Sequence, residues 1–222
     1  RPPQLIERGL MPADGGFSMA SPMDEHGFFS LALAADYTMA AIEKARVIVL
    51  EVNPNVPFAN GDCHIHISQV AALCESEEPI LEVGLPKIGS VQAAIGRYVA
   101  EMIPDGAPLQ IGYGGIPDAV VMQLTDKHDL GIHTEMVGDG IMTLVEAGVV
   151  TNRKKNYHHG KMLATFALGS KKLYQFMHRN PALEMHPVDF TNDPYLAGQN
   201  DNLHAINATM QIDFLGQCGS ES

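Results

Sequence analysis

The chain has 222 residues, of which 45% are hydrophobic and 18% charged, a composition typical of a folded α/β protein with one large core or two smaller ones. Its net charge of -12 disfavours nucleic acid as a partner, because binding to phosphates relies on clustered Lys and Arg. No apolar run approaches the roughly 20 residues that cross a bilayer, and no signal peptide opens the sequence, so we expect a cytoplasmic protein without a membrane partner.

The cysteines and the two ends of the sequence give further expectations. Cys63, Cys74 and Cys218 are odd in number and form no C-x-x-C pair, so we expect reduced thiols rather than a disulfide framework or a structural zinc site. The sequence begins at Arg1 without methionine and stops at Ser222, just beyond a strand-like run. We therefore expect a fragment of a longer polypeptide.

The first 90 residues predict a helix and a strand, followed by less regular segments. Tyr37 to Lys44 is helix-like, and Ala45 to Val52 is a continuous β-branched run, typical of a strand covered on both faces. A second apolar segment extends from Ile65 to Leu73. Proline and glycine interrupt any periodicity in residues 80–90, which we interpret as a linker with a domain boundary after residue 86.

The rest of the chain alternates between predicted strands and predicted helices. The predicted helices are Val91–Ile103, Pro117–Thr125, Ile141–Ala147 and Ser170–His178. The predicted strands are Leu109–Tyr113, Leu130–His133, Lys161–Leu168 and Leu183–Val188, with one or two more in His204–Phe214. This alternation indicates an α/β fold with a largely parallel sheet and right-handed crossovers.

The sharpest local motif is QIGYGGIPD at residues 110–118, a strand that runs into a glycine turn and then a helix with Pro117 expected at its first position. Glycines let a substrate approach the backbone, and N–H groups at a helix start point toward developing negative charge, so the turn could form an oxyanion hole. The alternative is a turn that serves only tight packing. A dinucleotide fingerprint is not matched, because Pro117 occupies the position of its third glycine.

The next predicted strand ends in GIHTEM at residues 131–136. Ligands of open α/β sheets bind at the carboxyl ends of strands, so we expect Glu135 in the same crevice as the glycine turn. Glu135 could instead cap or begin the following helix, where a carboxylate is favoured by the helix dipole. His133 is either a catalyst or, more commonly for a histidine at a strand end, a hydrogen-bonded core residue.

A turn-rich loop, SPMDEHGF at residues 21–28, carries Asp24 and His26. These side chains could simply be solvated. They could also contact a substrate if the loop closes over a cleft.

The sequence contains two histidine pairs, and one of them invites a metal interpretation. His64 and His66 alternate along a strand and would share one face, but no matching Asp, Glu or Cys cluster accompanies them, so we predict no metal site. His158 and His159 lie beside Lys154 and Lys155, in what we expect to be an exposed connection without a catalytic role.

Several long motifs in order resemble the acetyl-CoA hydrolase/transferase family, and within it the 4-hydroxybutyrate CoA-transferase branch. The resemblance extends over essentially the whole chain. The motifs are SPMDEHGFFS, DYTMAAIEKARVIVLEVN, GLPKIGSVQAAIG, LQIGYGGIPDAV, LGIHTEM, GKMLATFALGSKKLY, HPVDF and FLGQ.

The resemblance implies two open α/β domains of the CoA-transferase fold, with mostly parallel sheets, an active site in the cleft between them, and both domains incomplete here. Residues 1–86 would be the end of the first domain and residues 87–222 the start of the second. Glu135 in the IHTEM-type motif would be the nucleophile. The CoA-binding and oxyanion segment would consist of Gly112, Tyr113, Gly114, Gly115 and Ile116. The glycine-rich loop that follows the GQ-type strand in relatives is missing from this sequence.

The implied activity is transfer of CoA between an acyl-CoA, such as acetyl-CoA or butyryl-CoA, and a short carboxylate, such as 4-hydroxybutyrate or acetate. Glutamate suits the reaction because its carboxylate is ionised at neutral pH and needs no base. Coenzyme A would be a substrate, with no permanently bound cofactor, and the protein a homodimer or larger homo-oligomer. An acyl-CoA hydrolase that uses the same glutamate is the nearest alternative, and a non-catalytic CoA-binding module is a more remote one.

Overall fold

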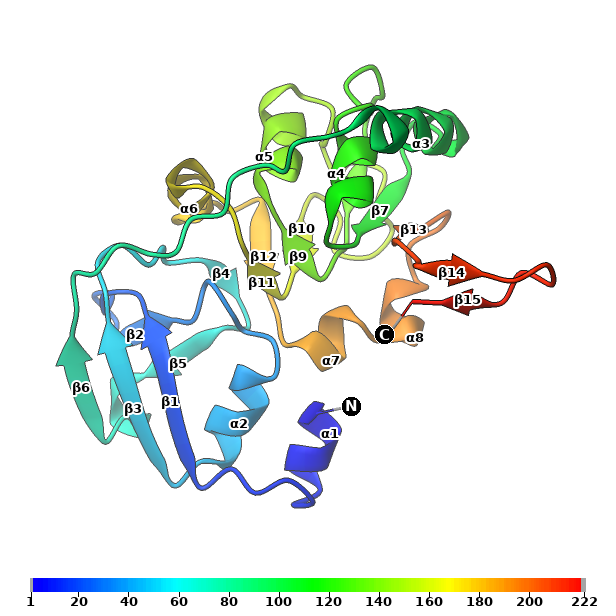
Figure 1. The fold of residues 1–222 in the computed structure, drawn as a ribbon. Coiled ribbons are helices and arrows are strands. Elements are labelled where there is room, and N and C mark those ends of the chain that lie inside the picture. Colours follow the sequence, from blue (N-terminus) through cyan, green and yellow to red (C-terminus); the bar gives the residue numbers. More distant parts are fainter. Residues whose placement is uncertain (1, 221–222) are drawn as a thin grey trace.

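The computed structural model describes residues 2–220 and has an α/β fold with mostly parallel sheets. Two lobes are visible in Figure 1, the first formed by residues 2–75 and the second by residues 90–220. Residues 76–89 form neither helix nor strand and run from one lobe to the other. The domain boundary expected after residue 86 falls within this connecting segment.

The first lobe contains two helices, one 3-10 turn and six strands. They are α1 (Pro2–Glu7), β1 (Gly15–Ala20), β2 (Phe28–Ser30), α2 (Thr38–Lys44), β3 (Val47–Val52), β4 (Asn60–Gly61), β5 (His64–His66), η1 (Ile67–Gln69) and β6 (Ala72–Glu75).

The second lobe continues the alternation. Its helices are α3 (Ser90–Met102), α4 (Gly115–Val121), α5 (Asp139–Glu146), α6 (Lys171–Met177), α7 (Val188–Thr191) and α8 (Pro194–Ala197). Its strands are β7 (Pro108–Ile111), β8 (Gly131–Ile132), β9 (Met136–Val137), β10 (Met162–Ala164), β11 (Phe166–Ala167), β12 (Leu183–Met185), β13 (His204–Ile206), β14 (Gln211–Ile212) and β15 (Cys218–Gly219).

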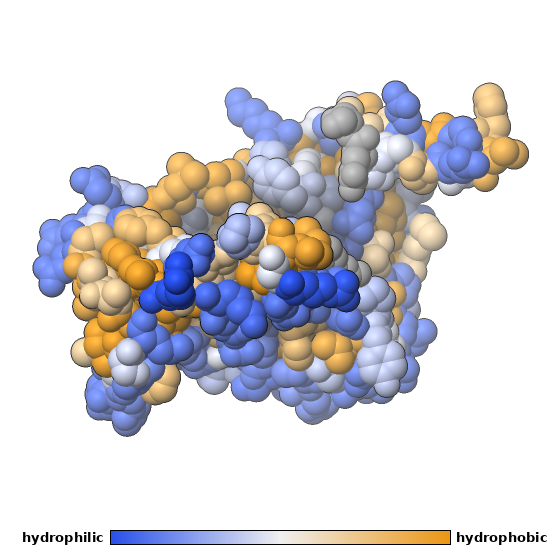
Figure 2. Space-filling model, turned by 90° about the horizontal axis from the view of Figure 1, so that it is seen from below, coloured by the Kyte–Doolittle hydropathy of each residue, from blue (hydrophilic) through white to orange (hydrophobic). Residues whose placement is uncertain are grey.

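The sheet of the first lobe is parallel, in the order β1-β3-β6. Its inward-facing Ile48 and Leu50 are buried, whereas Phe17, Met19 and Val47 are exposed. The prediction that Ala45 to Val52 is covered on both faces is therefore wrong for the described part of the chain. Figure 2 shows hydrophobic side chains on the surface of this lobe, at the left of the view.

Strands from both lobes share a parallel sheet. One set of three strands has the order β13-β7-β8, and another has the order β10-β12-β4. A bridge between His133 and Leu163 joins the two sets, and β4 belongs to the first lobe. Gly61 of β4 makes this pairing possible: its φ is +107°, and a Cβ atom there would lie 2.3 Å from the carbonyl oxygen of Met185. The two lobes are thus connected by backbone hydrogen bonding as well as by the connecting segment.

Most predicted elements of the second lobe are confirmed within two or three residues, but three are corrected. Helix α4 begins at Gly115, so Pro117 is its third residue rather than its first; the first turn tolerates proline because its N–H groups lack helical partners. The strand predicted at Lys161–Leu168 is interrupted at Thr165, where the chain changes from β12 to β9 as its pairing partner. The strand predicted at Leu183–Val188 ends at Met185 because Pro187 starts the turn into α7.

Among residues 2–220, no helix combines the length and apolar content that crossing a membrane would require.

Candidate active site

The glycine turn and Glu135 emerge at the same edge of the sheet. Strands β7 and β8 are parallel neighbours, and Leu109 is paired with Ile132. Beyond this pair, the buried hydroxyl of Thr134 donates to the carbonyl of Ile111 at 2.9 Å and accepts from its N–H at 2.9 Å. The residue before Gly112 and the residue before Glu135 are therefore fixed to each other.

Glu135 has a fixed backbone and an exposed side chain. Its carbonyl accepts hydrogen bonds from the N–H groups of Thr165 at 2.9 Å and Phe166 at 3.1 Å. Its carboxylate oxygen Oε2 accepts a hydrogen bond from the side-chain amide of Asn192 at 2.7 Å. Helix α5 begins only at Asp139 and has Gly138 as its N-cap, so Glu135 does not cap this helix.

The glycine turn has the backbone freedom that the sequence predicts. Gly114 adopts φ +127° and ψ 171°, and a Cβ atom on Gly114 or Gly115 would meet nothing within 4 Å. Gly112 has a more crowded setting: a Cβ atom there would lie 2.5 Å from Oδ1 of Asn207 and 3.0 Å from the carbonyl oxygen of Ile206, so the Asn207 side chain would have to move. In the described part of the chain, the N–H groups of Gly114 and Gly115 donate to no acceptor, so they remain available to a ligand.

A pocket of about 170 Å³ is bordered by the glycine turn, by Met136 of the strand β9 and by the residues that follow this strand. It is lined by Val83, Gly84, Leu85, Pro86, Tyr113, Gly114, Gly115, Asp118, Met136, Gly138, Asp139 and Leu168. Burial raises the pKa of the Asp118 carboxyl in its wall. The structure thus brings the turn together with the residue that follows Glu135, and the connecting segment forms one wall, which the sequence did not predict.

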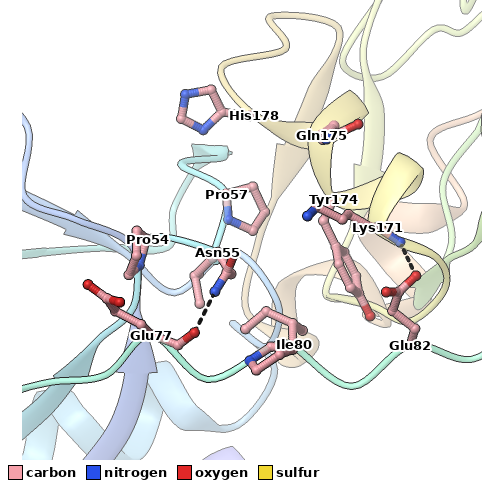
Figure 3. Close-up of a pocket in the computed structure, with 12 residues that line it drawn as sticks. Pro54, Asn55, Pro57, Glu77, Ile80, Glu82, Lys171, Tyr174, Gln175 and His178 are labelled. Atoms are coloured by element: carbon pink, nitrogen blue, oxygen red, sulfur yellow. Dashed lines mark hydrogen bonds between the residues drawn. The ribbon is translucent and has the colours of Figure 1, made fainter.

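A second pocket, of about 350 Å³, lies between the lobes along the earlier part of the connecting segment (Figure 3). Residues 54–57 form one side, and α6 contributes Lys171 and Tyr174 on the other. The connecting segment is attached here because Glu82 Oε2 accepts from the backbone N–H of Lys171 at 2.7 Å and the Tyr174 hydroxyl donates to the carbonyl of Leu81 at 2.8 Å. The same segment therefore borders both pockets.

Asp24 stabilises the loop in which it lies. Its Oδ1 accepts from the N–H groups of His26 at 2.9 Å and Phe28 at 2.8 Å, and the bond from Phe28 holds the pKa of the Asp24 carboxyl below its usual value. His26 is exposed and pairs with Glu25 at 3.5 Å. Within residues 2–220, no hydrogen bond joins Asp24 or His26 to Glu135 or the glycine turn, and their contact with a substrate stays a prediction.

His133 is a hydrogen-bonded core residue, as one of the two interpretations held. Its Nε2 lies 2.7 Å from the carbonyl oxygen of Thr191, and its Nδ1 lies 3.1 Å from the side-chain nitrogen of Asn200. Burial lowers the pKa of His133 to about 4, so the ring is neutral. Because Thr191 precedes Asn192, His133 also anchors the chain that carries the amide bonded to Glu135.

The connection around His158 is not the exposed loop that we predicted. Lys155 is buried, donates to the carbonyls of Ile132 at 2.9 Å and Lys161 at 2.6 Å, and has its pKa lowered by burial to about 7. Gly131 leaves space for it, since a Cβ there would lie 2.6 Å from Cγ of Lys155. His158 is half-buried, and only Lys154 and His159 of this group are exposed.

His64 and His66 share β5, but each ring has another partner. His64 Nε2 lies 2.8 Å from the carbonyl oxygen of Ala59, and His66 Nδ1 lies 2.8 Å from the hydroxyl of Ser68. A group with possible metal ligands does occur elsewhere in the described residues, at His158, Glu184 and His186. Sequence reasoning missed this group because His158 is 26 positions from Glu184, and it missed Asn192 because that residue is 57 positions from Glu135.

Comparison with known proteins is consistent with this geometry. The acetyl-CoA hydrolase/transferase N-terminal domain matches residues 2–83, and the acetyl-CoA hydrolase/transferase C-terminal domain matches residues 169–222. The chain is 50% identical to the succinyl-CoA:cyclohexane-1-carboxylate CoA transferase of Geobacter metallireducens and 44% identical to the 4-hydroxybutyrate coenzyme A transferase of Clostridium kluyveri, in each case over 99% of this chain. It covers 50% and 51% of those two proteins, so it spans about half the length of the curated relatives it matches.

A solved structure has a similar fold. The 4-hydroxybutyrate CoA-transferase from Porphyromonas gingivalis superposes with a TM-score of 0.93 at 42% identity, over 97% of this chain and 55% of that one. Sequence, domain models and fold agree, and the chain belongs to the acetyl-CoA hydrolase/transferase family.

Proposed function

We propose that the full-length polypeptide containing this chain is a CoA-transferase that forms a covalent glutamyl-CoA thioester on Glu135. The observation that carries the proposal is an exposed carboxylate on a fixed backbone, at the same sheet edge as a glycine turn whose N–H groups are not used within the described residues. The names of relatives support CoA transfer, including transferases that act on 4-hydroxybutyrate and on butyryl-CoA with acetate.

The first half-reaction moves CoA from the donor acyl group to the carboxylate of Glu135, and the second moves it to the incoming acid. A carboxylate oxygen of Glu135 attacks the thioester carbonyl carbon, the C–S bond breaks, and CoA leaves as a thiolate, which gives a mixed anhydride. The thiolate then attacks the glutamyl carbonyl, and the original acid leaves as its carboxylate. The incoming carboxylate attacks the enzyme thioester, and the same steps in reverse deliver its acyl-CoA and restore Glu135. Ping-pong kinetics follow.

The surrounding groups have defined roles in this scheme. The amide of Asn192 orients the attacking carboxylate through its 2.7 Å hydrogen bond. The N–H groups of Gly114 and Gly115, with Gly112, Tyr113 and Ile116 completing the turn, receive the oxyanion that develops at each attack. Exclusion of water decides between transfer and hydrolysis, because water that reached the thioester would release free CoA.

We further propose acetyl-CoA or butyryl-CoA as donor and 4-hydroxybutyrate or acetate as acceptor, with CoA acting as substrate and no resident cofactor in the reaction. A homodimer or larger homo-oligomer, a cytoplasmic location, a domain boundary after residue 86 and substrate contacts from Asp24 and His26 belong to the same proposal. Each of these follows from the sequence and from resemblance to the family.

The test is mass spectrometry of the peptide containing Glu135 after the full-length protein has been incubated with acyl-CoA. The expected result is a CoA adduct on Glu135, lost after hydroxylamine treatment and absent in Glu135→Gln. The control Glu101→Gln changes an exposed glutamate on α3 and should leave the adduct intact. An unmodified wild-type peptide after turnover would overturn the proposal.

A hydrolase is the alternative that uses the same carboxylate. Release of CoA at the same rate with and without added acetate or 4-hydroxybutyrate, with no new acyl-CoA formed, would establish it. A CoA-binding module without catalysis would bind CoA and form no adduct.

A further inference from the structure

Three ionisable side chains meet beside the strand β12, and none of them lines the pockets described above. Nδ1 of His158 and Nε2 of His186 lie 2.9 Å and 3.3 Å from the same carboxylate oxygen, Oε2 of Glu184. One ligand atom from each of the three residues lies within 4.8 Å of those from the other two. Their side chains are only 27%, 20% and 11% exposed for His158, Glu184 and His186, so this is not a solvated surface cluster.

The backbone aims these side chains at one point. Glu184 lies in the middle of β12 and His186 directly follows this strand, and alternate positions of an extended chain face the same side. His158 adopts a φ of +48°, a left-handed conformation that is uncommon for residues other than glycine and that clusters at functional sites.

Aromatic packing holds both imidazoles. The ring of Phe190 stacks on His186 with a centroid distance of 4.6 Å and lies edge-on to His158 at 5.7 Å. Tyr157 lies edge-on to His158 at 4.6 Å. The two rings therefore keep their nitrogens directed at Glu184 at little further entropic cost.

We propose that His158, Glu184 and His186 bind a divalent transition-metal ion of the Zn²⁺ type. Two imidazole nitrogens and one carboxylate oxygen form a donor set that such ions prefer, whereas Mg²⁺ and Ca²⁺ prefer oxygen ligands alone. Ligand bonds of about 2.1 Å in tetrahedral geometry place donor atoms about 3.4 Å apart. The observed 2.9 and 3.3 Å from Glu184 need a small expansion, and the two histidine nitrogens lie within 4.8 Å of each other. Water would complete the coordination.

The ion would have a structural effect, separate from the chemistry at Glu135. It would join the turn that contains His158 to the end of β12, from which the chain enters α7 through Pro187. Lys161 places its Nζ 3.8 Å from the other oxygen of Glu184, and this positive charge opposes binding of a cation. The affinity is therefore expected to be lower than that of a closed four-ligand zinc site.

The test uses the full-length protein, purified without a histidine tag and stripped with a chelator, and then titrated with Zn²⁺ or Co²⁺. We expect one ion per chain by elemental analysis, a visible absorption band with Co²⁺ and a rise in Tm with Zn²⁺. His158→Gln and Glu184→Gln keep similar shapes and should abolish all three signals. His159→Gln changes the exposed neighbour and should retain them.

Two results would overturn the proposal. One is a stripped wild-type protein that takes up no ion in stoichiometric amount, which would make the group a hydrogen-bonded cluster alone. The other is uptake that is equal in wild type and His158→Gln, which would place the ion elsewhere. Circular dichroism of the stripped variants serves as the control that distinguishes loss of the ion from unfolding.

Discussion

The hydroxyl of Thr134 satisfies both backbone polar groups of Ile111 with two hydrogen bonds of 2.9 Å. One buried side chain therefore ties the strand that enters the glycine turn to the strand that leads into Glu135. Loss of this hydroxyl would remove a constraint between the strand of the proposed nucleophile and the strand of the proposed oxyanion donors.

Thr134→Val removes this hydroxyl and should destabilise the protein. The buried N–H and carbonyl of Ile111 would lose their partner, at a cost of roughly 1–3 kcal/mol for each group. Urea denaturation should show a lower midpoint, and kcat should fall because the two halves of the site are no longer fixed. Thr134→Ser keeps the hydroxyl, so equal losses in both variants would contradict this account.

Asn192→Ala should lower kcat about tenfold to a hundredfold, the range expected for loss of a hydrogen bond to a charged group. Asn192→Asp should be more harmful, because it places a second carboxylate against Glu135. Steady-state kinetics of the full-length protein measure both. Asn156→Ala removes a surface amide bonded to Asp201 and serves as the control; a loss in Asn156→Ala as large as in Asn192→Ala would count against a local role.

Gly114→Ala and Gly115→Ala separate backbone strain from steric hindrance. Neither Cβ would meet an atom within 4 Å, but only Gly114 has a positive φ, of +127°. Gly114→Ala should therefore cost roughly 1–3 kcal/mol of stability or shift the turn, and activity should fall. Gly115→Ala should unfold at the wild-type temperature. Thermal unfolding and acyl-CoA assays of the two variants check the contrast, which would be refuted by equal behaviour.

His133 should make the protein less stable as the pH falls. Its folded pKa of about 4 lies below the usual 6.5 mainly because burial disfavours the charged ring. Lys155, His158 and His186 nearby also oppose a further positive charge. The unfolded chain binds a proton on His133 more readily, so stability present above pH 6.5 is lost between about 6.5 and 4, by roughly 3 kcal/mol.

His133→Gln provides the comparison, since glutamine can also donate to Thr191 and accept from Asn200. The free energy of unfolding of the wild type, relative to His133→Gln, should fall as the pH is lowered from 7 to 4.5. Parallel curves for the two proteins would show that His133 does not titrate in this way.

The sequence allowed the local part of this structure to be predicted, because helices and strands follow from short-range periodicity. The β-branched run before Asn53 became β3, and the glycine turn at residues 112–115 had a backbone signature that can be read directly. The prediction that this turn and Glu135 share a sheet edge rested on the rule that ligands of open α/β sheets bind at the carboxyl ends of the strands.

The rest depended on contacts between distant residues. Asn192 is 57 positions from Glu135, and no spacing rule connects them. Lys155 looked like one of two exposed lysines, yet its stem fits beside Gly131 and its amine binds backbone carbonyls. His158 looked like half of an exposed pair, and only the fold brings it to Glu184.

The bare face of the β1-β3-β6 sheet determines how the 222-residue polypeptide behaves as a solute. Phe17 and Val47 are 69% and 51% exposed, and when two such faces meet, the release of the water that covers them lowers the free energy. Sulfate strengthens this tendency, so the polypeptide should precipitate at lower sulfate concentrations than a variant with Phe17→Lys and Val47→Lys. Charge on these two positions would keep the molecules apart while the buried side of the sheet stayed intact.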